Sequence, residues 1–203
     1  IGYGNVARAF ARLLESKHAA YPFRIAGIHT ATRGAAYDIS GLPAEPVFGP
    51  PASSVEEFLD KASAEVVFEL TPMNPESGEP AISHVRAAFA RGMHVITANK
   101  GPVAFAYREL AREAKQAGVE FRYEPVTMDG TPVYSLVRNC MPGVRIQGFS
   151  GTLTSTAQLI LETMREGKSL EEGIEQARLR ELAEADPWFD IDGWDSACKA
   201  AAL

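Results

Sequence analysis

Apolar and polar residues follow two periods along the first 125 residues, one typical of strands and one typical of helices. Short apolar runs predict strands at residues 23–30, 65–72, 93–100 and 119–126. Helical periodicity between these runs predicts helices at residues 2–17, 54–62, 80–92 and 107–118. Strands that alternate with helices of this length indicate a parallel sheet covered on both faces. We therefore expect a doubly wound, Rossmann-type α/β domain over residues 1–125.

The pattern loosens after residue 125. Residues 144–155 are rich in β-formers, and residues 156–167 and 169–182 have helical periodicity. We expect a second α+β domain here, for substrate binding and dimerisation, over residues 126–203. The chain opens directly on a glycine turn and ends within a helical run, so we expect a truncated first strand and a missing C-terminal part.

In the first predicted helix, Val6, Phe10, Leu13 and Leu14 form an apolar stripe. We expect this stripe to be the buried side of the helix, because a surface helix turns its apolar side toward the core.

Composition and charge narrow the class of protein. The net charge of −6 and the pI of about 5.3 argue against a nucleic-acid or anionic-membrane partner. The chain has no run of 18 apolar residues, so we expect no membrane span. Cys140 and Cys198 are too far apart in sequence to indicate a disulfide framework, and no signal peptide is visible. We expect a cytoplasmic protein that acts on a small molecule.

A glycine-rich turn opens the first helix. Gly2, Gly4 and Ala7 form the pattern G-x-G-x-x-A, which permits a tight turn and a close approach of backbone to a pyrophosphate. We expect Gly2, Gly4, Asn5 and Val6 to contact a dinucleotide. The alternative is a tight turn without a ligand.

The ends of the later strands suggest where the rest of a cofactor lies. Arg33 follows the strand predicted at residues 23–30, near the position where NAD-type sites carry an acid. An arginine there suits a 2′-phosphate, so we expect NADP more than NAD. Thr71, Pro72 and Lys100 stand at the C-terminal ends of the strands predicted at 65–72 and 93–100, the edge where open α/β sheets bind ligands. The alternative for Lys100 is a surface lysine in a turn.

The stretch AEADPWFDIDGWDSACK, residues 183–199, interleaves acids with aromatic residues. Asp195 and Lys199 are four residues apart, which places them on one face of a helix. A buried lysine can act as an acid/base group, and nearby carboxylates can hold a substrate ammonium group. The alternative is an ordinary ion pair on the helix surface.

Four motifs in order, GYGNVA, VITANKGP, YEPVTMDGTP and AEADPWFDIDGWDSACK, resemble the homoserine dehydrogenase family over essentially the whole chain. The resemblance implies a Rossmann domain followed by a substrate and dimerisation domain, in a homodimer. It also implies NAD(P)-dependent interconversion of L-homoserine and L-aspartate 4-semialdehyde, on the route to threonine, methionine and isoleucine.

The resemblance assigns roles to individual residues. Lys199 matches the catalytic acid/base lysine, and Lys100 matches a lysine at the junction of nicotinamide and substrate. Glu184 and Asp195 match carboxylates that bind homoserine. A loop resembles a site for a monovalent cation such as Na⁺, with these ligands: Glu124 and the carbonyls of Thr127, Asp129 and Thr131.

The chain departs from the family pattern in three regions. Thr154 and Ser155 stand where the family has Asn and Gly, and Glu181 stands where it has a glycine. In the cation loop, Thr127 and Asp129 stand where the family usually has Val and Gly. Two alternatives therefore stay open. The chain could be a dehydrogenase of the same fold for another amino-acid semialdehyde, or a nucleotide-binding descendant without catalysis.

Overall fold

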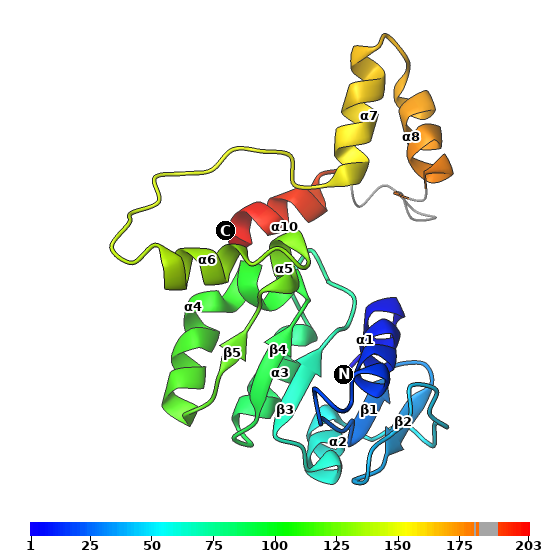
Figure 1. Ribbon diagram of the computed structural model, residues 1–203, viewed down its shortest axis with the longest axis vertical. Helices are drawn as coiled ribbons and strands as arrows, with labels where there is room; N and C mark the ends of the chain where they lie inside the picture. Colours follow the sequence, from blue (N-terminus) through cyan, green and yellow to red (C-terminus); the bar gives the residue numbers. More distant parts are fainter. Residues whose placement is uncertain (181, 183–190) are drawn as a thin grey trace.

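The computed structural model describes residues 1–180, 182 and 191–203 of the chain (Figure 1). The strands are β1 (Gly27–Thr30), β2 (Gly34–Tyr37), β3 (Val66–Glu69), β4 (His94–Thr97) and β5 (Phe121–Arg122). The helices are α1 (Asn5–Ser16), α2 (Val55–Ala62), α3 (Ala81–Phe89), α4 (Lys100–Ala117), α5 (Pro125–Met128), α6 (Val133–Cys140), α7 (Ser155–Arg165), α8 (Leu170–Leu179) and α10 (Trp194–Ala202). The order of elements in the first part is that of an α/β fold.

The strands form a parallel sheet with a hairpin beside it. Strands β3, β4 and β5 are parallel neighbours, whereas β1 and β2 pair antiparallel. The first two residues lie between these parts, because the Gly2 amide donates to the His29 carbonyl and the Leu70 amide donates to the Ile1 carbonyl. The predicted parallel α/β sheet is confirmed, and β2 is an antiparallel addition that the apolar pattern did not predict.

Helices cover both faces of the sheet. Val67 and Val95 pack with Val85 of α3 and Leu110 of α4 in the main core. Successive strand residues point to opposite faces, so Phe68 points away from this core. Its ring instead lies 4.7 Å, between centroids, from the ring of Phe10 on α1. Helix α1 therefore packs on one face, and α3 and α4 pack on the other.

The side of α1 that is buried differs from the predicted stripe. Val6 is 65% exposed and Leu13 is 52% exposed, whereas Ala7 and Ala11 are buried. Alanines let the helix approach the sheet closely, as the third position of the glycine motif requires. The packed side of this helix therefore combines the small residues Ala7 and Ala11 with Phe10, while Val6 and Leu13 of the predicted stripe face away from it.

Several predicted boundaries are wrong. The helix predicted at 107–118 begins at Lys100, and the strand predicted at 119–126 is reduced to β5, followed by α5. No described strand includes residues 144–155, which are irregular up to the start of α7. A strand needs a neighbour for its backbone hydrogen bonds, and no described strand lies along this segment. Helix α6 was not predicted.

The remaining helices form two groups. Helices α7 and α8 pack on each other around Leu159, Ile160 and Ala177, and Figure 1 shows this pair standing apart from the sheet. Both begin at hydroxyl caps, and Ser169 forms a capping box with Glu172. Helix α10 instead returns to the sheet domain and packs on α4 and α5.

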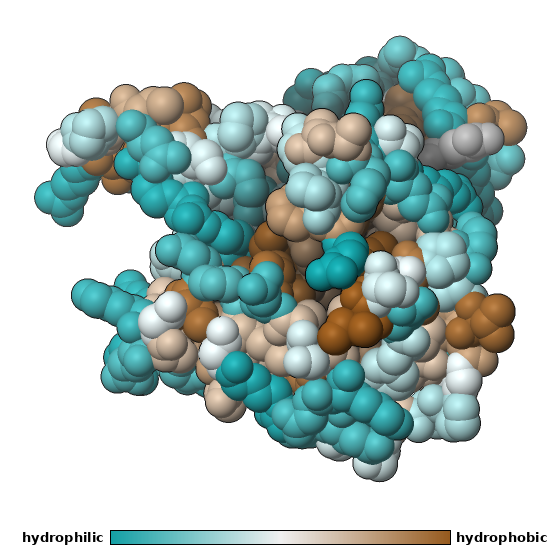
Figure 2. Space-filling model, turned by 60° about the horizontal axis from the view of Figure 1, so that its bottom comes forward, coloured by the Kyte–Doolittle hydropathy of each residue, from teal (hydrophilic) through white to brown (hydrophobic). Residues whose placement is uncertain are grey.

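The surface is mixed in character. Figure 2 shows one face on which hydrophobic side chains gather in a central hollow, surrounded by hydrophilic ones. In the part of the chain that the structure describes, no helix combines the length and the apolar composition needed to cross a membrane.

Candidate active site

Two lysines share one buried carboxylate between α4 and α10. The Lys100 Nζ lies 3.0 Å from Asp195 Oδ1, and the Lys199 Nζ lies 2.9 Å from Asp195 Oδ2. Asp195 is 5% exposed, and the lysine side chains are 23% and 17% exposed. The arrangement therefore differs from an ordinary surface ion pair, and two ammonium groups against one carboxylate leave a net positive charge at the cluster.

Different elements place the two lysines. Lys100 is the first residue of α4, whose N-terminus is capped by the Asn99 side chain through the Gly101 amide. Lys199 lies one turn after Asp195 on α10 and also donates a hydrogen bond of 2.9 Å to the Leu153 carbonyl. The irregular segment before α7 thus supplies one of the two acceptors that hold Lys199.

The carboxyl edge of the sheet brings the predicted residues Thr71 and Pro72 close to the start of α4. The Asn99 amide group donates to the Thr71 carbonyl at 3.0 Å and to the Pro72 carbonyl at 3.3 Å. Glu69 is fully buried behind this turn and accepts hydrogen bonds from Thr71. Sequence reasoning missed Glu69 and Asn99. The signal for Glu69 was an acid inside an apolar strand, directly before a hydroxyl residue.

The glycine turn has the geometry that a dinucleotide site needs. Gly2 has φ of +84°, and a Cβ there would lie 2.6 Å from the Leu70 carbonyl oxygen. Gly4 has open space around its Cα and precedes α1 without a side-chain cap. Asn5 and Val6 are the first, exposed residues of α1. The helix N-terminus is thus open to an anionic ligand, as the sequence predicts.

Arg33 lies beside this turn, in the connection between β1 and β2. Its guanidinium donates to the Tyr3 carbonyl and lies 4.7 Å from the centroid of the Phe48 ring. The structure therefore brings the predicted Arg33 to the glycine turn, where an adenosine phosphate would lie in a Rossmann domain.

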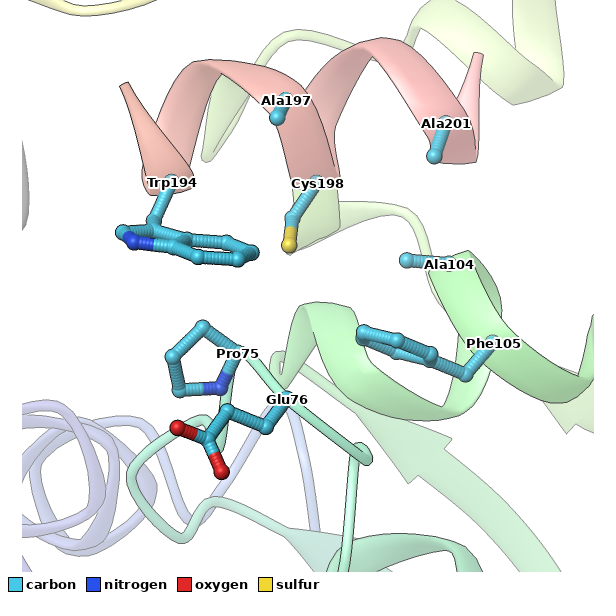
Figure 3. Close-up of a pocket in the computed structure, with 8 residues that line it drawn as sticks. All are labelled: Pro75, Glu76, Ala104, Phe105, Trp194, Ala197, Cys198 and Ala201. Carbon is cyan, nitrogen blue, oxygen red and sulfur yellow. The ribbon is translucent and has the colours of Figure 1, made fainter. Parts of the chain in front are cut away.

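A pocket of about 450 Å³ opens between α4, α10 and the loop after β3 (Figure 3). It is lined by Pro75, Glu76, Ala104, Phe105, Trp194, Ala197, Cys198 and Ala201. The pocket is mostly apolar, and its volume falls in the range of small-molecule pockets. Burial, and then the Asp195 carboxylate, raises the pKa of the Cys198 thiol, so that thiol is a poor nucleophile.

Family comparisons decide the identity of this fold. Residues 2–124 match the model described as homoserine dehydrogenase, NAD binding domain. Residues 132–203 match the model described as homoserine dehydrogenase.

The chain belongs to the homoserine dehydrogenase family.

Individual relatives agree with this assignment. The chain is 34% identical to the NAD(+)-dependent homoserine dehydrogenase of Pseudomonas canavaninivorans, over 100% of this chain and 63% of that protein. It is also 34% identical to the homoserine dehydrogenase of Methanocaldococcus jannaschii, over 100% of this chain and 66% of that protein. The chain thus spans just under two thirds of the length of these relatives.

Solved structures give the same fold. A homoserine dehydrogenase from Thermoplasma acidophilum has a TM-score of 0.76 and 26% identity, covering 98% of this chain and 64% of that one. A hyperthermophilic archaeal homoserine dehydrogenase in complex with NADPH has a TM-score of 0.84 and 26% identity, covering 100% and 66%. The first domain of this homoserine dehydrogenase family member is therefore an NAD-binding domain of Rossmann type.

The predicted cation loop is engaged with its own chain. Both carboxylate oxygens of Glu124 lie 3.1 Å from the Ser135 amide, and the Thr131 carbonyl accepts from the Val133 amide. Thr127 is buried, its hydroxyl bonded to that of Tyr134. The Glu124 carboxylate and the Thr131 carbonyl thus accept hydrogen bonds within the chain, and the monovalent-cation site, which also includes the carbonyls of Thr127 and Asp129, stays a prediction from the sequence.

The predicted homoserine-binding Glu184 lies outside the described residues, as does Glu181. Of the family's expected catalytic and substrate-binding residues, the structure places Lys100, Asp195 and Lys199 in one cluster.

Proposed function

We propose that this chain is the part of a homoserine dehydrogenase that binds NAD(P) and carries the catalytic lysine, and that it interconverts L-homoserine and L-aspartate 4-semialdehyde. The observation that carries the proposal is the cluster of Lys100, Asp195 and Lys199 at the carboxyl edge of a nicotinamide-binding sheet. A dehydrogenase of this kind needs a proton donor and acceptor at the reacting oxygen, because alcohol and aldehyde differ by a hydride and a proton. When bound, a nicotinamide cofactor supplies the group that exchanges the hydride.

Lys199 is the proposed acid/base residue. An ammonium group has three N–H donors, and Asp195 and the Leu153 carbonyl accept two of those of Lys199. The third has no acceptor among the described residues, and we assign it to the aldehyde oxygen during reduction. In the oxidising direction the alcohol proton passes to the neutral amine of Lys199, as the C–O single bond becomes the carbonyl.

Lys100 and Asp195 complete the proposed site. Asp195 holds both ammonium groups, so its first effect is to position them, and Lys100 keeps donors that can bind the substrate carboxylate. The Lys100 ammonium group favours an anionic end of the substrate on its side of the cluster. Glu184 remains the proposed partner of the substrate ammonium group, together with Asp195.

The cofactor preference is proposed to be NADP. The guanidinium of Arg33 next to the glycine turn, with the carbonyl of Tyr3 and the ring of Phe48 holding it, supports a contact with a 2′-phosphate. Replacement Arg33→Ala is expected to raise the KM for NADP about tenfold or more, with a much smaller effect on NAD. Arg24→Ala, at an exposed arginine of the preceding loop, is the matched control.

The domain division, the assembly and the location are proposed as well. We propose a cofactor domain over residues 1–125 and a substrate and dimerisation domain over residues 126–203. A homodimer is supported by exposed apolar side chains that follow the cofactor domain: Leu136, Val137, Val144, Ile146 and Phe149. The acidic composition and the free cysteines support a cytoplasmic location.

The function is tested with a series of amino alcohols of different length. The purified full-length protein is assayed for NADP- and NAD-linked oxidation of L-homoserine, of L-serine and of the homologue one carbon longer than L-homoserine. We expect kcat/KM for L-homoserine to exceed both others by about tenfold or more, since one methylene changes transition-state binding by that order. A higher value for the longer alcohol would favour a dehydrogenase of another semialdehyde. Cofactor binding without turnover of any alcohol would favour a non-catalytic descendant.

A further inference from the structure

A carboxylate outside the catalytic cluster is fully buried at the end of β3. Glu69 is 0% exposed, and no lysine or arginine forms an ion pair with it among the described residues. Its nearest basic group is the His84 ring, whose Nδ1 lies 3.4 Å from Glu69 Oε1. A charge removed from water is destabilising unless hydrogen bonds replace its hydration. The groups that donate hydrogen bonds to the Glu69 carboxylate therefore show which parts of the chain this carboxylate positions.

The first donor is the turn that follows β3. Glu69 Oε1 accepts from both the hydroxyl and the amide of Thr71, the amide at 3.3 Å. Thr71 is followed by Pro72, and these two residues are the predicted cofactor contacts at this edge of the sheet. The carboxylate thus fixes the backbone and the side chain of Thr71 from inside the protein.

The second donor connects Glu69 to Lys100, at the start of the helix that follows β4. The Thr97 hydroxyl lies 3.3 Å from both Glu69 Oε2 and the Glu69 carbonyl, and its oxygen accepts from the Asn99 backbone amide at 3.0 Å. Asn99 in turn donates to the Thr71 carbonyl and caps the first turn of α4, which begins at Lys100. One buried network therefore joins the turn after β3 to the residue that reaches Asp195.

We infer that Glu69 is a positioning residue: through Thr71 it sets the cofactor-contacting turn, and through Thr97 and Asn99 it sets the start of α4 and hence Lys100. The inference rests on the proposed function for the identity of the cofactor and of the catalytic lysine. It assigns Glu69 no contact with the substrate, because the side chain is enclosed by protein groups.

Two substitutions separate hydrogen bonding from simple packing. Glu69→Gln keeps the shape, with its carbonyl oxygen able to accept from Thr71 and its amide able to donate to the Thr97 oxygen. Glu69→Leu fills the space but accepts nothing. Glu120→Gln, at an exposed glutamate of the same domain, is the matched control. For each full-length variant, three measurements are made. The NADPH dissociation constant is measured by fluorescence, kcat and KM are measured with L-homoserine, and Tm is measured by thermal unfolding.

We expect Glu69→Gln to stay within about threefold of the parent in all kinetic and binding constants. Glu69→Leu is expected to weaken NADPH binding and to lower kcat, each about tenfold or more, because small displacements of binding and catalytic groups have effects of this order or greater. If Glu69→Leu does not fold, Thr97→Val removes the hydroxyl between Glu69 and the Asn99 backbone amide and is expected to lower kcat in the same direction.

The inference is overturned by either of two results. A Glu69→Leu protein with a lower Tm but unchanged NADPH affinity and kcat would give Glu69 a role in packing only. A Glu69→Gln protein as impaired as Glu69→Leu would mean that the charge matters and the hydrogen-bond geometry does not. A parent that binds NADPH without oxidising L-homoserine would end the proposed function, while the NADPH affinities would still decide the role of Glu69.

Discussion

Lys100 and Lys199 reach the same carboxylate from two regions that are held in different ways. Lys100 begins α4 directly beyond the parallel sheet, where Asn99 and Thr97 are buried and bonded to one another. Lys199 lies on α10, where its spacing from Asp195 and one backbone carbonyl, that of Leu153, hold it. The first lysine is fixed by a core and the second by a helix face and a loop.

The difference has a consequence for stability and for function. The sheet region has a large core, which includes the fully buried Leu59, Val95 and Leu110, whereas the α7–α8 pair has a small core of its own. Disturbing the second region should therefore move Lys199 without unfolding the sheet. Disturbing the shared carboxylate should affect both lysines at once.

Asp195→Asn should have the largest effect, because it removes the group that both lysines share. The neutral amide can accept from one ammonium group but turns its own N–H donors toward the other, so two cations are left facing each other. We expect kcat/KM for L-homoserine to fall by about a hundredfold or more. Asp192→Asn, an exposed aspartate three residues earlier, should leave kcat/KM unchanged. Near-parent activity of Asp195→Asn would mean that the lysines do not depend on this carboxylate.

Thr154→Ala should have an intermediate effect that is specific to Lys199. Thr154 is the N-cap of α7 and accepts from the Ala157 amide, and it follows the residue whose carbonyl binds Lys199. Loss of the cap is expected to lower the free energy of unfolding by about 1 kcal/mol and to lower kcat, since the Leu153 carbonyl is no longer held. Chemical denaturation and steady-state kinetics measure the two effects.

Ser169→Ala is the control for this prediction. Ser169 caps α8 and is distant in sequence from the Lys199 acceptor, so its loss should also lower stability by about 1 kcal/mol but leave kcat unchanged. Equal effects of the two substitutions on kcat would contradict a separate role for the segment before α7.

The smallest expected effect concerns pH and the contact of Glu124 with the first turn of α6. Burial alone would raise the pKa of the Glu124 carboxyl, but hydrogen bonds from the Ser135 hydroxyl and amide and from the Tyr134 amide outweigh it and hold that pKa below its usual value. A lowered pKa contributes stability that is present above the unfolded-state value, near 4.5, and is lost as pH falls through the folded-state pKa.

Glu124→Gln should therefore make the protein slightly less stable at pH 7 and should flatten the loss of stability on acidification. Thermal unfolding between pH 7 and pH 3 measures this dependence for the parent and the variant. An identical pH dependence of Tm in both proteins would show that the Glu124 carboxylate does not stabilise α6.

The sequence predicted the sheet domain better than the rest, for physical reasons that particular residues illustrate. Strands buried on both faces have continuous apolar runs, and glycines mark the turn at Gly2, so β3, β4 and the start of α1 were predicted. The buried side of α1 was not predicted, because an alanine such as Ala7 is only weakly hydrophobic. Residues 144–155 have strand propensity, but whether they pair depends on a neighbour that local sequence does not specify.

The candidate site likewise has features that local sequence predicts and features that only the packing of distant segments determines. The spacing of Asp195 and Lys199 is local and was predicted, and the sheet edge predicted the neighbourhood of Lys100. That Lys100 shares the Asp195 carboxylate depends on the packing of α10 on α4, which no local pattern states. Glu69 and Asn99 were missed because their roles follow from hydrogen bonds between neighbouring strands.

The most direct test of the proposed chemistry is the NADP-linked oxidation of L-homoserine by the parent and by Lys199→Ala, with NADPH affinity measured on both. We expect kcat to fall by about a hundredfold or more, as for the loss of an acid/base group, with little change in NADPH affinity. A Lys199→Ala protein that keeps kcat within about threefold of the parent would contradict the central claim, because the proton would then have to pass through another group.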